Sequence, residues 1–433
     1  MKVLIAGAAG YLGEHVVRAA MDAGHEVAVY VRGGTVRFPH GVRLIDGDLT
    51  DIALLQSALA DVDAAIFSAG RNFQPGLPLD AYYSQNVSIV EAFLEALAAS
   101  NQNARVVFTS SMSAIGGSEQ PVVFNEASGR AAVADGRLNA YDRAKIECER
   151  LARAAQNAGR NLVILNPGFM LGPSASADSR MTTGFLVHWY CLKKNPAIVG
   201  DGGHSFCDVR DVARAHVAAL TRGSGQYILG GDNLGAAEIQ SLMSAQTGLG
   251  TPLQVPVAVA YGVSAAMDAV SAATFGAWRN PIHREFARSL PLYYWADSSR
   301  AASDLGYHTR PLDQTIRDTI DDFVARGVLP EEFAYVATIN DENRSAVLLL
   351  RELADRNLHR SFLLPQLPKI LAACRQNGEL NGALQTALAA GRYDPDKGRF
   401  LWTTTAPKPA LEKLRGLLDY CYYASDQFRG RVM

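Results

Sequence analysis

Cysteine is scarce in this 433-residue sequence, and its few positions follow no recognisable pattern. The five cysteines are far apart, none forms a C-x-x-C pair, and the nine histidines show neither H-x-x-x-H nor carboxylate spacing. An odd number of dispersed thiols fits neither a disulfide framework nor a zinc site. The sequence therefore predicts no metal centre, and it favours a reduced, cytoplasmic compartment.

Strong charge and long apolar runs are also lacking. The net charge is −2 without a long run of one sign, so the basic surface typical of nucleic-acid binding is absent. The apolar run near the N-terminus is short and is interrupted by Gly7, Gly10 and Gly13, unlike a secretion signal. The Ala-rich stretch 255–278 contains Asp268. It predicts a buried or amphipathic helix pair rather than a transmembrane segment, and peripheral membrane contact stays open.

The first half of the chain alternates short β-branched runs with helical stretches. Strands are expected at 2–6, 26–31, 42–45, 64–68, 105–109 and 161–166, and helices at 14–23, 52–60, 87–99 and 141–158. Strands that alternate with helices of this length predict an α/β fold with a doubly wound parallel sheet, the Rossmann arrangement.

The length of the chain predicts more than one structural unit. We expect a dinucleotide-binding Rossmann domain over 1–175, to which 205–235 return, and a smaller mixed substrate lobe over 176–204 and 236–328. Residues 329–433 predict an α-helical C-terminal extension that contains no catalytic motif. Its helices are expected at 345–356, 367–376, 382–390 and 410–423, with breaks at Pro365, Pro368, Gly378, Gly391 and Pro395.

A glycine-rich turn lies between the first expected strand and the first expected helix. Glycines permit a tight turn and let the backbone approach a pyrophosphate, which rests on the positive N-terminus of the helix. This position indicates a dinucleotide site rather than an ordinary turn. The residues of the predicted turn are Gly7, Ala9, Gly10, Tyr11, Leu12 and Gly13.

Three later strand ends complete the predicted cofactor site. The second strand ends on Arg32 and not on an acid, and a guanidinium suits a 2′-phosphate, so NADP(H) is preferred and NAD(H) is possible. An ordinary solvated arginine is the alternative. Asp48, followed by Leu49, could meet the adenine amino group or cap a helix starting at Thr50. The small residues after the fourth strand, which allow close approach, are Ser68, Ala69 and Gly70.

A phenol and an ammonium stand four residues apart at Tyr141 and Lys145, on one face of an expected helix. A neighbouring lysine favours the phenolate, and a nicotinamide cation would add to the effect. Lowering a tyrosine pKa from about 10 to about 7 takes roughly 4 kcal/mol, which two nearby positive charges in a water-poor cleft could supply. Tyr141 could then exchange a proton with a carbonyl or alcohol. Ser110 and Ser111 end the strand 105–109, and one of these hydroxyls could hold the substrate oxygen.

Residues 1 to about 328 resemble the extended short-chain dehydrogenase/reductase family. The resemblance is carried by GAAGYLG, GDLTD, Asn86-Val87, VVFTSSMSAIG, YDRAK, PGFMLGP and FCDVRDVARA. It implies a catalytic set of Ser111, Tyr141 and Lys145, with Ser111 preferred over Ser110. It also implies that the cofactor site includes Asn86, Tyr141, Lys145, Pro167, Gly168 and Phe169.

The expected lobe is similar, more loosely, to the 3β-hydroxysteroid dehydrogenase and dihydroflavonol reductase branch. That similarity rests on Val255-Pro256, Asn280-Pro281, YWAD at 294–297, LGY at 305–307 and RPL at 310–312. It implies a mostly apolar small-molecule carbonyl or alcohol substrate, and the family resemblance implies a homodimer through helices 87–99 and 141–158. Two features depart from the family: Asn166 replaces an arginine common before the Pro-Gly turn, and the tail from about 329 matches nothing in it.

Several aromatic and histidine side chains of the lobe have two interpretations. They could line the substrate cleft, or they could simply pack together. These residues are Phe185, His188, Trp189, Tyr190, His204 and Phe206.

Three functions remain open on this sequence. The leading hypothesis is an NAD(P)H-dependent oxidoreductase that interconverts a ketone or aldehyde and an alcohol. A nucleotide-sugar epimerase or dehydratase is the second, although Met112-Ser113 lacks the acid pair expected of a dehydratase. A non-catalytic NADP(H)-binding regulatory protein is the third, and retention of both Tyr141 and Lys145 disfavours it.

Overall fold

The computed structural model describes residues 1–33, 37–72, 77–100, 103–128, 138–174, 185–192, 197–199, 202–273 and 289–423. The chain divides into two compact units. The first unit comprises Met1–Gly184, Ile198–Ala236 and Gln254–Leu312, and the second comprises Phe185–Ala197, Ala237–Leu253 and Asp313–Met433. Three stretches of the expected substrate lobe are therefore grouped with the C-terminal region. The predicted three-domain division stays a prediction.

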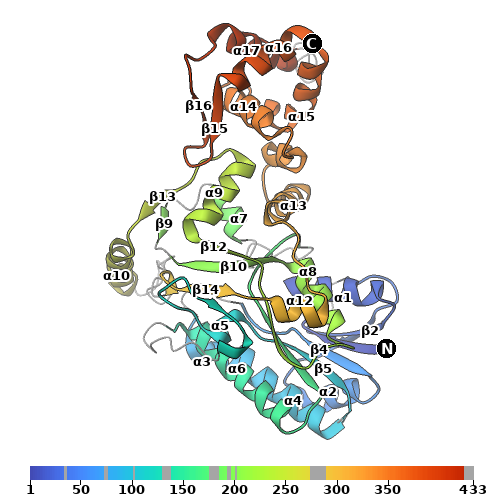
Figure 1. The fold of residues 1–433 in the computed structure, drawn as a ribbon. Coiled ribbons are helices and arrows are strands. Elements are labelled where there is room, and N and C mark those ends of the chain that lie inside the picture. Colours follow the sequence, from blue (N-terminus) through green and yellow to red (C-terminus); the bar gives the residue numbers. More distant parts are fainter. Residues whose placement is uncertain are drawn as a thin grey trace. The chain divides into compact units, whose positions relative to one another are not determined.

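A seven-stranded sheet forms the centre of the first unit, in the order β11-β7-β5-β4-β1-β2-β3 (Figure 1). Every pair in it is parallel, which confirms the predicted doubly wound fold. Its strands are β1 (Lys2–Ala6), β2 (Glu26–Val31), β3 (Arg43–Asp46), β4 (Ala64–Phe67), β5 (Arg105–Thr109), β7 (Leu162–Pro167) and β11 (Gly225–Leu229).

Helices cover both faces of this sheet. They are α1 (Tyr11–Asp22) and α8 (Val209–Ala218) on one face, and α2 (Ile52–Leu59), α4 (Ser88–Ser100) and α6 (Ala140–Asn157) on the other. The alternation of side chains along β1 explains why both faces need cover. Val3 and Ile5 join the core under α1 and α8, whereas Leu4 and Ala6 join the core under the other helices.

A second, curled sheet in the first unit has the order β12-β10-β14-β6, and β8 pairs with β10. Its strands are β6 (Val123–Phe124), β8 (Phe169–Leu171), β10 (Gly203–Asp208), β12 (Asp232–Gly235) and β14 (Tyr293–Ala296). The remaining elements are α3 (Leu79–Tyr82), the π-helical turn η1 (Tyr83–Val87), α5 (Met112–Ile115), η2 (Glu126–Ser128), α10 (Val257–Ala273) and α12 (Ser299–Leu305). Two further short strands are β9 (Ala197–Val199) and β13 (Leu253–Val255).

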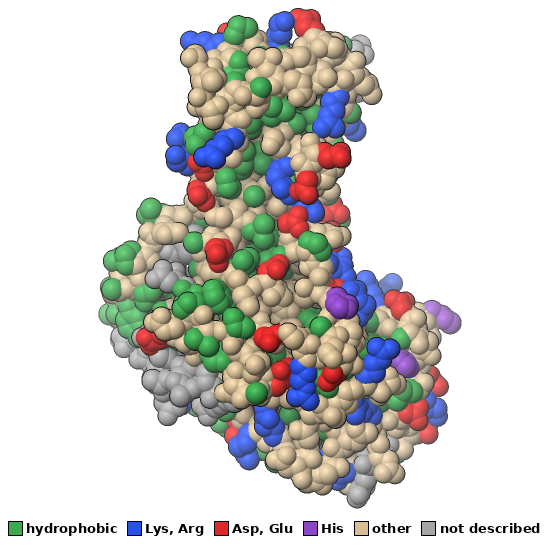
Figure 2. Space-filling model, in the orientation of Figure 1, with side chains coloured by type: hydrophobic (Ala, Val, Ile, Leu, Met, Phe, Trp, Pro, Cys, Tyr) green, Lys and Arg blue, Asp and Glu red, His purple; other side chains and the backbone are tan. Residues whose placement is uncertain are grey.

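Helix α10 lies within the stretch expected to form an apolar helix pair, and residues 274–288 fall outside the described part of the chain. Val259, Val263 and Val270 on this helix are each about half exposed. Apolar side chains gather over it at the left of Figure 2. None of the described helices is long and apolar enough to cross a bilayer. Contact with a membrane surface stays a prediction.

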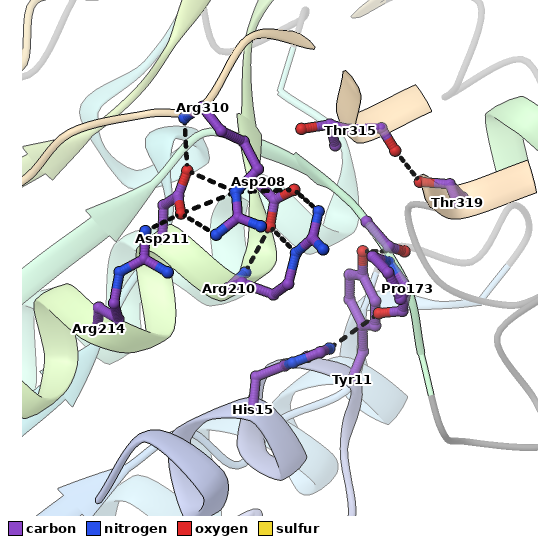
Figure 3. Close-up of polar contacts among 11 residues, drawn as sticks. Tyr11, His15, Pro173, Asp208, Arg210, Asp211, Arg214, Arg310, Thr315 and Thr319 are labelled. Atoms are coloured by element: carbon purple, nitrogen blue, oxygen red, sulfur yellow. Dashed lines mark hydrogen bonds and ion pairs between the residues drawn. The ribbon is translucent and has the colours of Figure 1, made fainter. Parts of the chain in front are cut away.

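A cluster of ion pairs holds the end of the first unit to α8 (Figure 3). Asp208, the N-cap of α8, pairs with Arg210 at 2.7 Å and lies 3.6 Å from Arg310. Asp211 accepts both the backbone N–H and the guanidinium of Arg310, each at 2.7 Å. Burial would raise the pKa of Asp208, but the two arginines hold it below its usual value.

The second unit contains α7 (Phe185–Cys191), α9 (Ala236–Thr247), α13 (Leu312–Ala325), η5 (Glu331–Thr338), α14 (Arg344–Asp355), α15 (Arg360–Gln376), α16 (Gly378–Ala389), β15 (Gly391–Asp394), β16 (Arg399–Trp402) and α17 (Lys408–Tyr423). Polar contacts join the tail to α9 and the residues after it. The Tyr335 hydroxyl donates to Thr247 O at 2.5 Å, and Arg351 donates to Gly248 O. The tail is thus the larger part of a unit that also includes residues 237–253.

Two expectations for the tail are wrong. It contains the antiparallel hairpin β15–β16, which the search for helical periodicity missed. Pro365 and Pro368 lie inside α15 and do not interrupt it. Each proline removes a backbone donor, but the helix buries an apolar face whose packing outweighs the lost hydrogen bonds. The buried residues of that face are Leu363, Leu364, Leu367, Ile370, Leu371 and Cys374.

Candidate functional site

The turn between β1 and α1 can be made only with glycine at two positions. Gly7 has φ 87°, in the left-handed region, and a Cβ added there would lie 2.5 Å from the backbone N of Ala69. A Cβ on Gly13 would lie 2.1 Å from Gly7 O. The N-cap of α1 is Gly10, which offers no side-chain oxygen to the amides of the first turn. This bare helix N-terminus beside a close backbone crossing fits the pyrophosphate of a dinucleotide.

Tyr11 and His15 attach α1 to the loop that follows β8 (Figure 3). The Tyr11 hydroxyl donates to Gly172 O at 3.0 Å, and His15 Nε2 lies 2.8 Å from Pro173 O. Burial lowers the pKa of His15. Because the Tyr11 hydroxyl is bound to the protein itself, this residue could serve a cofactor through its backbone, as the turn requires. Ala9 and Leu12 pack with the core beneath the turn.

The segment after β4 passes beside the glycine turn, as the small residues there predict. The Ser68 hydroxyl donates to Ala6 O at 3.0 Å. Gly70 has φ 151°, and a Cβ there would lie 3.1 Å from the Oδ1 of Asn86. The buried amide of Asn86 accepts from Arg71 N at 2.5 Å and donates to Arg71 O at 3.1 Å. Asn86 therefore fixes the course of the chain at this edge of the sheet.

Arg32 follows β2 as predicted, and its side chain is 83% exposed. Its guanidinium lies 3.4 Å from Asp48 Oδ2. The N–H and hydroxyl of Thr50 bind the other oxygen of Asp48, and these bonds lower its pKa. The expectation that Asp48 caps the following helix is wrong, since α2 begins at Ile52 and its N-cap is Asp51, which accepts from Leu54 N.

One carboxylate near this position was missed in the sequence. Asp46 pairs in register with Val31, the last residue of β2, and accepts from Gly33 N at 2.9 Å. An acid therefore stands beside the end of β2 on the neighbouring strand. The sequence alone does not reveal this, because the register of β2 against β3 decides it. Leu49, after Asp48, packs against the apolar core.

Tyr141 lies in the first turn of α6. Asn139 caps this helix through a capping box, in which Asn139 and Asp142 each bind the other's backbone N–H. The Tyr141 ring packs edge-on against Tyr82 at 5.9 Å, and the hydroxyl of Ser111 lies near enough to lower the pKa of the Tyr141 phenol. Desolvation raises the pKa of Tyr141 even though Ser111 lowers it. The groups of the chain itself thus raise the pKa of Tyr141, because desolvation dominates. The predicted lowering also depends on the charge of a bound nicotinamide and stays a prediction.

Lys145 is one helical turn further along the same face. A Cβ placed on Gly70 would lie 4.0 Å from Lys145 Nζ, so the ammonium reaches the segment that passes the glycine turn. Desolvation lowers the pKa of Lys145, and the nearby Cys148 and Glu149 partly offset this. Both side chains are partly buried, and desolvation favours the neutral form of each more than bulk water does.

The two serines after β5 have different surroundings. Ser110 is buried and donates to Glu149 Oε2 at 2.6 Å. Ser111 is the N-cap of α5 and is only partly buried; its Oγ accepts from Ser113 N at 3.1 Å, and the same hydroxyl lowers the pKa of Tyr141. Of these two serines, only Ser111 is named among the groups that shift the pKa of Tyr141. The preference for Ser111 as the catalytic serine stays a prediction.

Aromatic rings surround Phe169, which follows the Pro167-Gly168 turn. The Phe169 ring lies 5.1 Å from that of His204 and 5.2 Å from that of Phe206. His204 in turn stacks on Tyr294 at 5.3 Å, with the ring planes 4° apart, and burial lowers the pKa of His204 to about 4. A neutral imidazole is thus part of an apolar wall. The sequence shows Tyr294 only as part of the YWAD motif. The contact between Tyr294 and His204 depends on the parallel pairing of β10 with β14, which the sequence does not reveal.

Other aromatic candidates of the lobe belong to the second unit. The Tyr190 hydroxyl donates to Gly250 O at 2.7 Å, and the His188 ring lies edge-on to Phe323. Both residues pack within that unit. The side chains of Phe185 and Trp189 lie outside the described ones, as do residues 129–137 and 175–184.

Two hollows in the described part of the chain contain none of the predicted catalytic residues. One of about 320 Å³ lies in the tail between α14, β16 and α17, lined by Leu349, Arg356, Arg399, Trp402 and Arg415 among others. One of about 220 Å³ lies between α8 and the residues after α12, with Asp211, Arg214 and Tyr307 in its lining. Neither hollow includes Ser111, Tyr141 or Lys145, so the candidate catalytic groups lie outside both. The described residues contain no cluster of three or more metal-ligating side chains.

The sequence profile of the NAD dependent epimerase/dehydratase family matches residues 3–230. The chain belongs to this family. It is accordingly a member of the extended short-chain dehydrogenase/reductase superfamily, and the predicted resemblance is confirmed. Members of this family bind NAD(P), and the glycine turn at Gly7 and Gly13 fits that group.

Relatives of this family member carry both reductase and epimerase names. A Synechocystis protein provisionally named dihydroflavonol 4-reductase is 28% identical over 75% of this chain and 94% of its own length. A 2-alkyl-3-oxoalkanoate reductase of Stenotrophomonas maltophilia is 26% identical over 71% of this chain and 94% of its own. A UDP-glucose 4-epimerase of Azospirillum brasilense is 30% identical over 53% of this chain and 71% of its own.

Solved structures also align with about three quarters of this chain. The structure of gox2253 aligns with a TM-score of 0.64 at 25% identity, covering 75% of this chain and 98% of that protein. MoeE5 in complex with UDP-glucuronic acid and NAD aligns with a TM-score of 0.58 at 25% identity, covering 76% and 100%. The chain thus belongs to a family of NAD(P)-dependent oxidoreductases and epimerases.

Proposed function

We propose that this protein is an NAD(P)H-dependent reductase or dehydrogenase that interconverts a ketone or aldehyde and an alcohol on a mostly apolar small molecule. The observation that carries the proposal is the placement of Ser111, which ends β5 and lowers the pKa of Tyr141, beside a phenol that lies one helical turn from Lys145. These groups stand where β5 and α6 meet, and Lys145 reaches the segment that passes the glycine turn. A proton donor, an orienting hydroxyl and a dinucleotide turn are the parts that carbonyl reduction requires.

The chain's own residues then have the following roles. Tyr141, with a raised pKa, stays protonated through neutral pH and donates its proton to the substrate oxygen. Ser111 donates a hydrogen bond to the same oxygen and holds it at the phenol. Lys145 holds the edge of the cofactor site and would favour the phenolate once the proton has left. Bound NAD(P)H would supply the hydride.

The apolar wall around Phe169 supports a mostly apolar substrate. Its rings are those of Phe169, Phe206, Tyr294 and the neutral imidazole of His204. Arg32, exposed beyond β2, supports a preference for NADP(H) over NAD(H), because a guanidinium can bind a 2′-phosphate. The reductase names among the relatives point to the same class of reaction.

The second candidate is a nucleotide-sugar epimerase, favoured by the epimerase names among the relatives. The two reactions use the same phenol but differ in the fate of the cofactor. A reductase consumes free NADPH in proportion to product, whereas an epimerase returns the cofactor to its starting state. A protein that binds the dinucleotide without chemistry would do neither.

The test measures NADPH consumption at 340 nm with a panel of aliphatic, aromatic and steroid-like ketones, beside UDP-glucose as the epimerase substrate. We expect turnover with an apolar ketone, and we expect Tyr141→Phe to lower kcat by about 10² to 10⁴ fold, the usual contribution of a positioned acid. Tyr83→Phe, a neighbouring and more exposed tyrosine in η1, is the matched control and should retain activity. Full activity of Tyr141→Phe, or conversion of UDP-glucose without net NADPH use, would overturn the proposal.

A further inference from the structure

A buried carboxylate lies beside the candidate catalytic serine. Glu149 is on α6, two turns beyond Tyr141, and is almost fully buried. Its Oε2 accepts from Ser110 Oγ and from Asn166 Nδ2, both at 2.6 Å. Its Oε1 accepts from Arg153 Nε at 3.0 Å and from Gln226 Nε2 at 3.2 Å. A buried charge with this many donors is held in one place, because any movement would leave hydrogen bonds unmade.

Asn166, also fully buried, links this carboxylate to Ser111. Its Nδ2 donates to Ser111 O at 2.9 Å as well as to Glu149, and its Oδ1 accepts from Gln226 Nε2 at 2.8 Å. These partners allow one orientation of the amide. Flipping it would set Oδ1 against a carbonyl and a carboxylate, and Nδ2 against another donor.

The same network accounts for the departure of Asn166 from the family pattern. The arginine expected before the Pro-Gly turn is absent, but a guanidinium still reaches the carboxylate from α6, where Arg153 pairs with Glu149 at 2.8 Å. Arg153 also donates to Gln226 Oε1 at 2.5 Å, and Gln226 in turn binds Asn166. With the positive charge supplied by Arg153, a short amide at position 166 can reach the Ser111 carbonyl.

We infer that Asn166, oriented by Glu149, is a positioning residue that sets Ser111 at the correct distance from Tyr141. The positions of Ser111 and Tyr141 both depend on Glu149. Tyr141 is attached through the helix that it shares with Glu149, and Ser111 is attached through the Asn166 amide. This inference rests on the proposed function, because positioning matters only if Ser111 holds the substrate oxygen.

The kinetic test compares Asn166→Ala with Arg105→Met. Arg105 lies at the opposite end of β5 and donates to the backbone oxygens of Ala219, Arg222 and Gly223, so its loss should destabilise the same sheet without touching Ser111. We expect Asn166→Ala to lower kcat by about 10 to 100 fold with the KM for NADPH unchanged, since small misplacements of reacting groups cost rate rather than binding. Arg105→Met should keep kcat at a comparable loss of Tm. Equal kcat values for the two variants would overturn the inference.

A second measurement does not depend on activity. In protein labelled with 3-fluorotyrosine, the Tyr141 resonance is the ¹⁹F signal lost in Tyr141→Phe. Asn166→Ala should shift this resonance, because Ser111 moves relative to the phenol, whereas Arg105→Met should leave it in place. If Asn166→Ala does not fold, Glu149→Gln, which keeps the shape of the side chain, takes its place. An unmoved resonance in the folded variant would refute the positioning role, whereas a chain that reduces no carbonyl but shows the shift would refute only the proposed function.

Discussion

Replacing Asp142 with asparagine should change how the stability of the protein depends on pH. Asp142 is 2% exposed, and desolvation raises its pKa from 3.8 to about 6, although Ser113 and the Asn139 N–H bind the carboxyl. The folded state thus holds this proton more tightly than the unfolded state does. The contribution of the group to stability is complete below pH 4 and is lost as the pH rises through 6.

The size of the effect follows from the two pKa values. The difference between 3.8 and about 6 corresponds to about 3 kcal/mol of unfolding free energy, of which about 2 kcal/mol is lost between pH 4 and pH 7. Asparagine keeps the oxygen that accepts from Asn139 N, but it has no proton to lose in this range. The difference in unfolding free energy between the variant and the wild type should therefore shift by about 2 kcal/mol in favour of the variant as the pH rises from 4 to 7.

The assay is urea unfolding of both proteins at pH 4, 5, 6 and 7, with the difference in unfolding free energy plotted against pH. Asp297→Asn is the control for a carboxyl without a raised pKa. Hydrogen bonds from Ser299 lower the pKa of Asp297 below 3.8, so its contribution to stability changes mainly below pH 4 and the difference for this variant should be nearly flat from pH 4 to pH 7. A flat difference for Asp142→Asn would show that Asp142 is not a desolvated carboxyl, and the reasoning would fail.

The remaining predictions concern the cofactor. Gly7→Ala should weaken NADPH binding at least tenfold, measured by the change in nicotinamide fluorescence, because its Cβ would meet the Ala69 backbone. Gly24→Ala, also at positive φ but with nothing within 4 Å, should bind normally; equal losses would mean that strain rather than contact is responsible. Arg32→Asp should shift the ratio of kcat/KM from NADPH toward NADH by tenfold or more, and an unchanged ratio would remove Arg32 from the cofactor site.

The parallel sheet could be predicted because most of its strands are short apolar runs that are buried on both faces. The second sheet could not, because β6, β8, β12 and β14 have only two to four residues each and pair over long distances in sequence. The hairpin β15–β16 was missed for a similar reason, since its eight strand residues mix Gly, Arg and Asp with aromatic residues. Pro365 and Pro368 predict breaks that the structure does not show, because burial of the apolar face of α15 outweighs the low helix propensity of proline.

Within the candidate site, the residues that the backbone pattern dictates were predictable. The Gly7 and Gly13 positions follow from strand, turn and helix, and Tyr141 and Lys145 follow from spacing on one helix face. The sequence could not show which side chains from different strands and helices form hydrogen bonds with one another. Glu149, Asn166 and Gln226 come from α6, β7 and β11, and only the order of the sheet brings their side chains together. Asp46 was missed for the same reason.

The protein's own groups raise the pKa of Tyr141, and this direction bears on whether Tyr141 acts as an acid or as a base in the proposed chemistry. The spacing of Tyr141 and Lys145 suggests an ammonium that stabilises a phenolate, but the chain desolvates both groups, so each favours its neutral form. A neutral phenol is a proton donor, and Ser111 is the one group among those that influence Tyr141 that lowers its pKa. The protein's own groups therefore prepare Tyr141 to give a proton rather than to take one, which is the role needed for carbonyl reduction. Under the proposed function Ser111 holds the substrate oxygen and also lowers the pKa of the phenol, so Asn166→Ala should lower the rate through both effects.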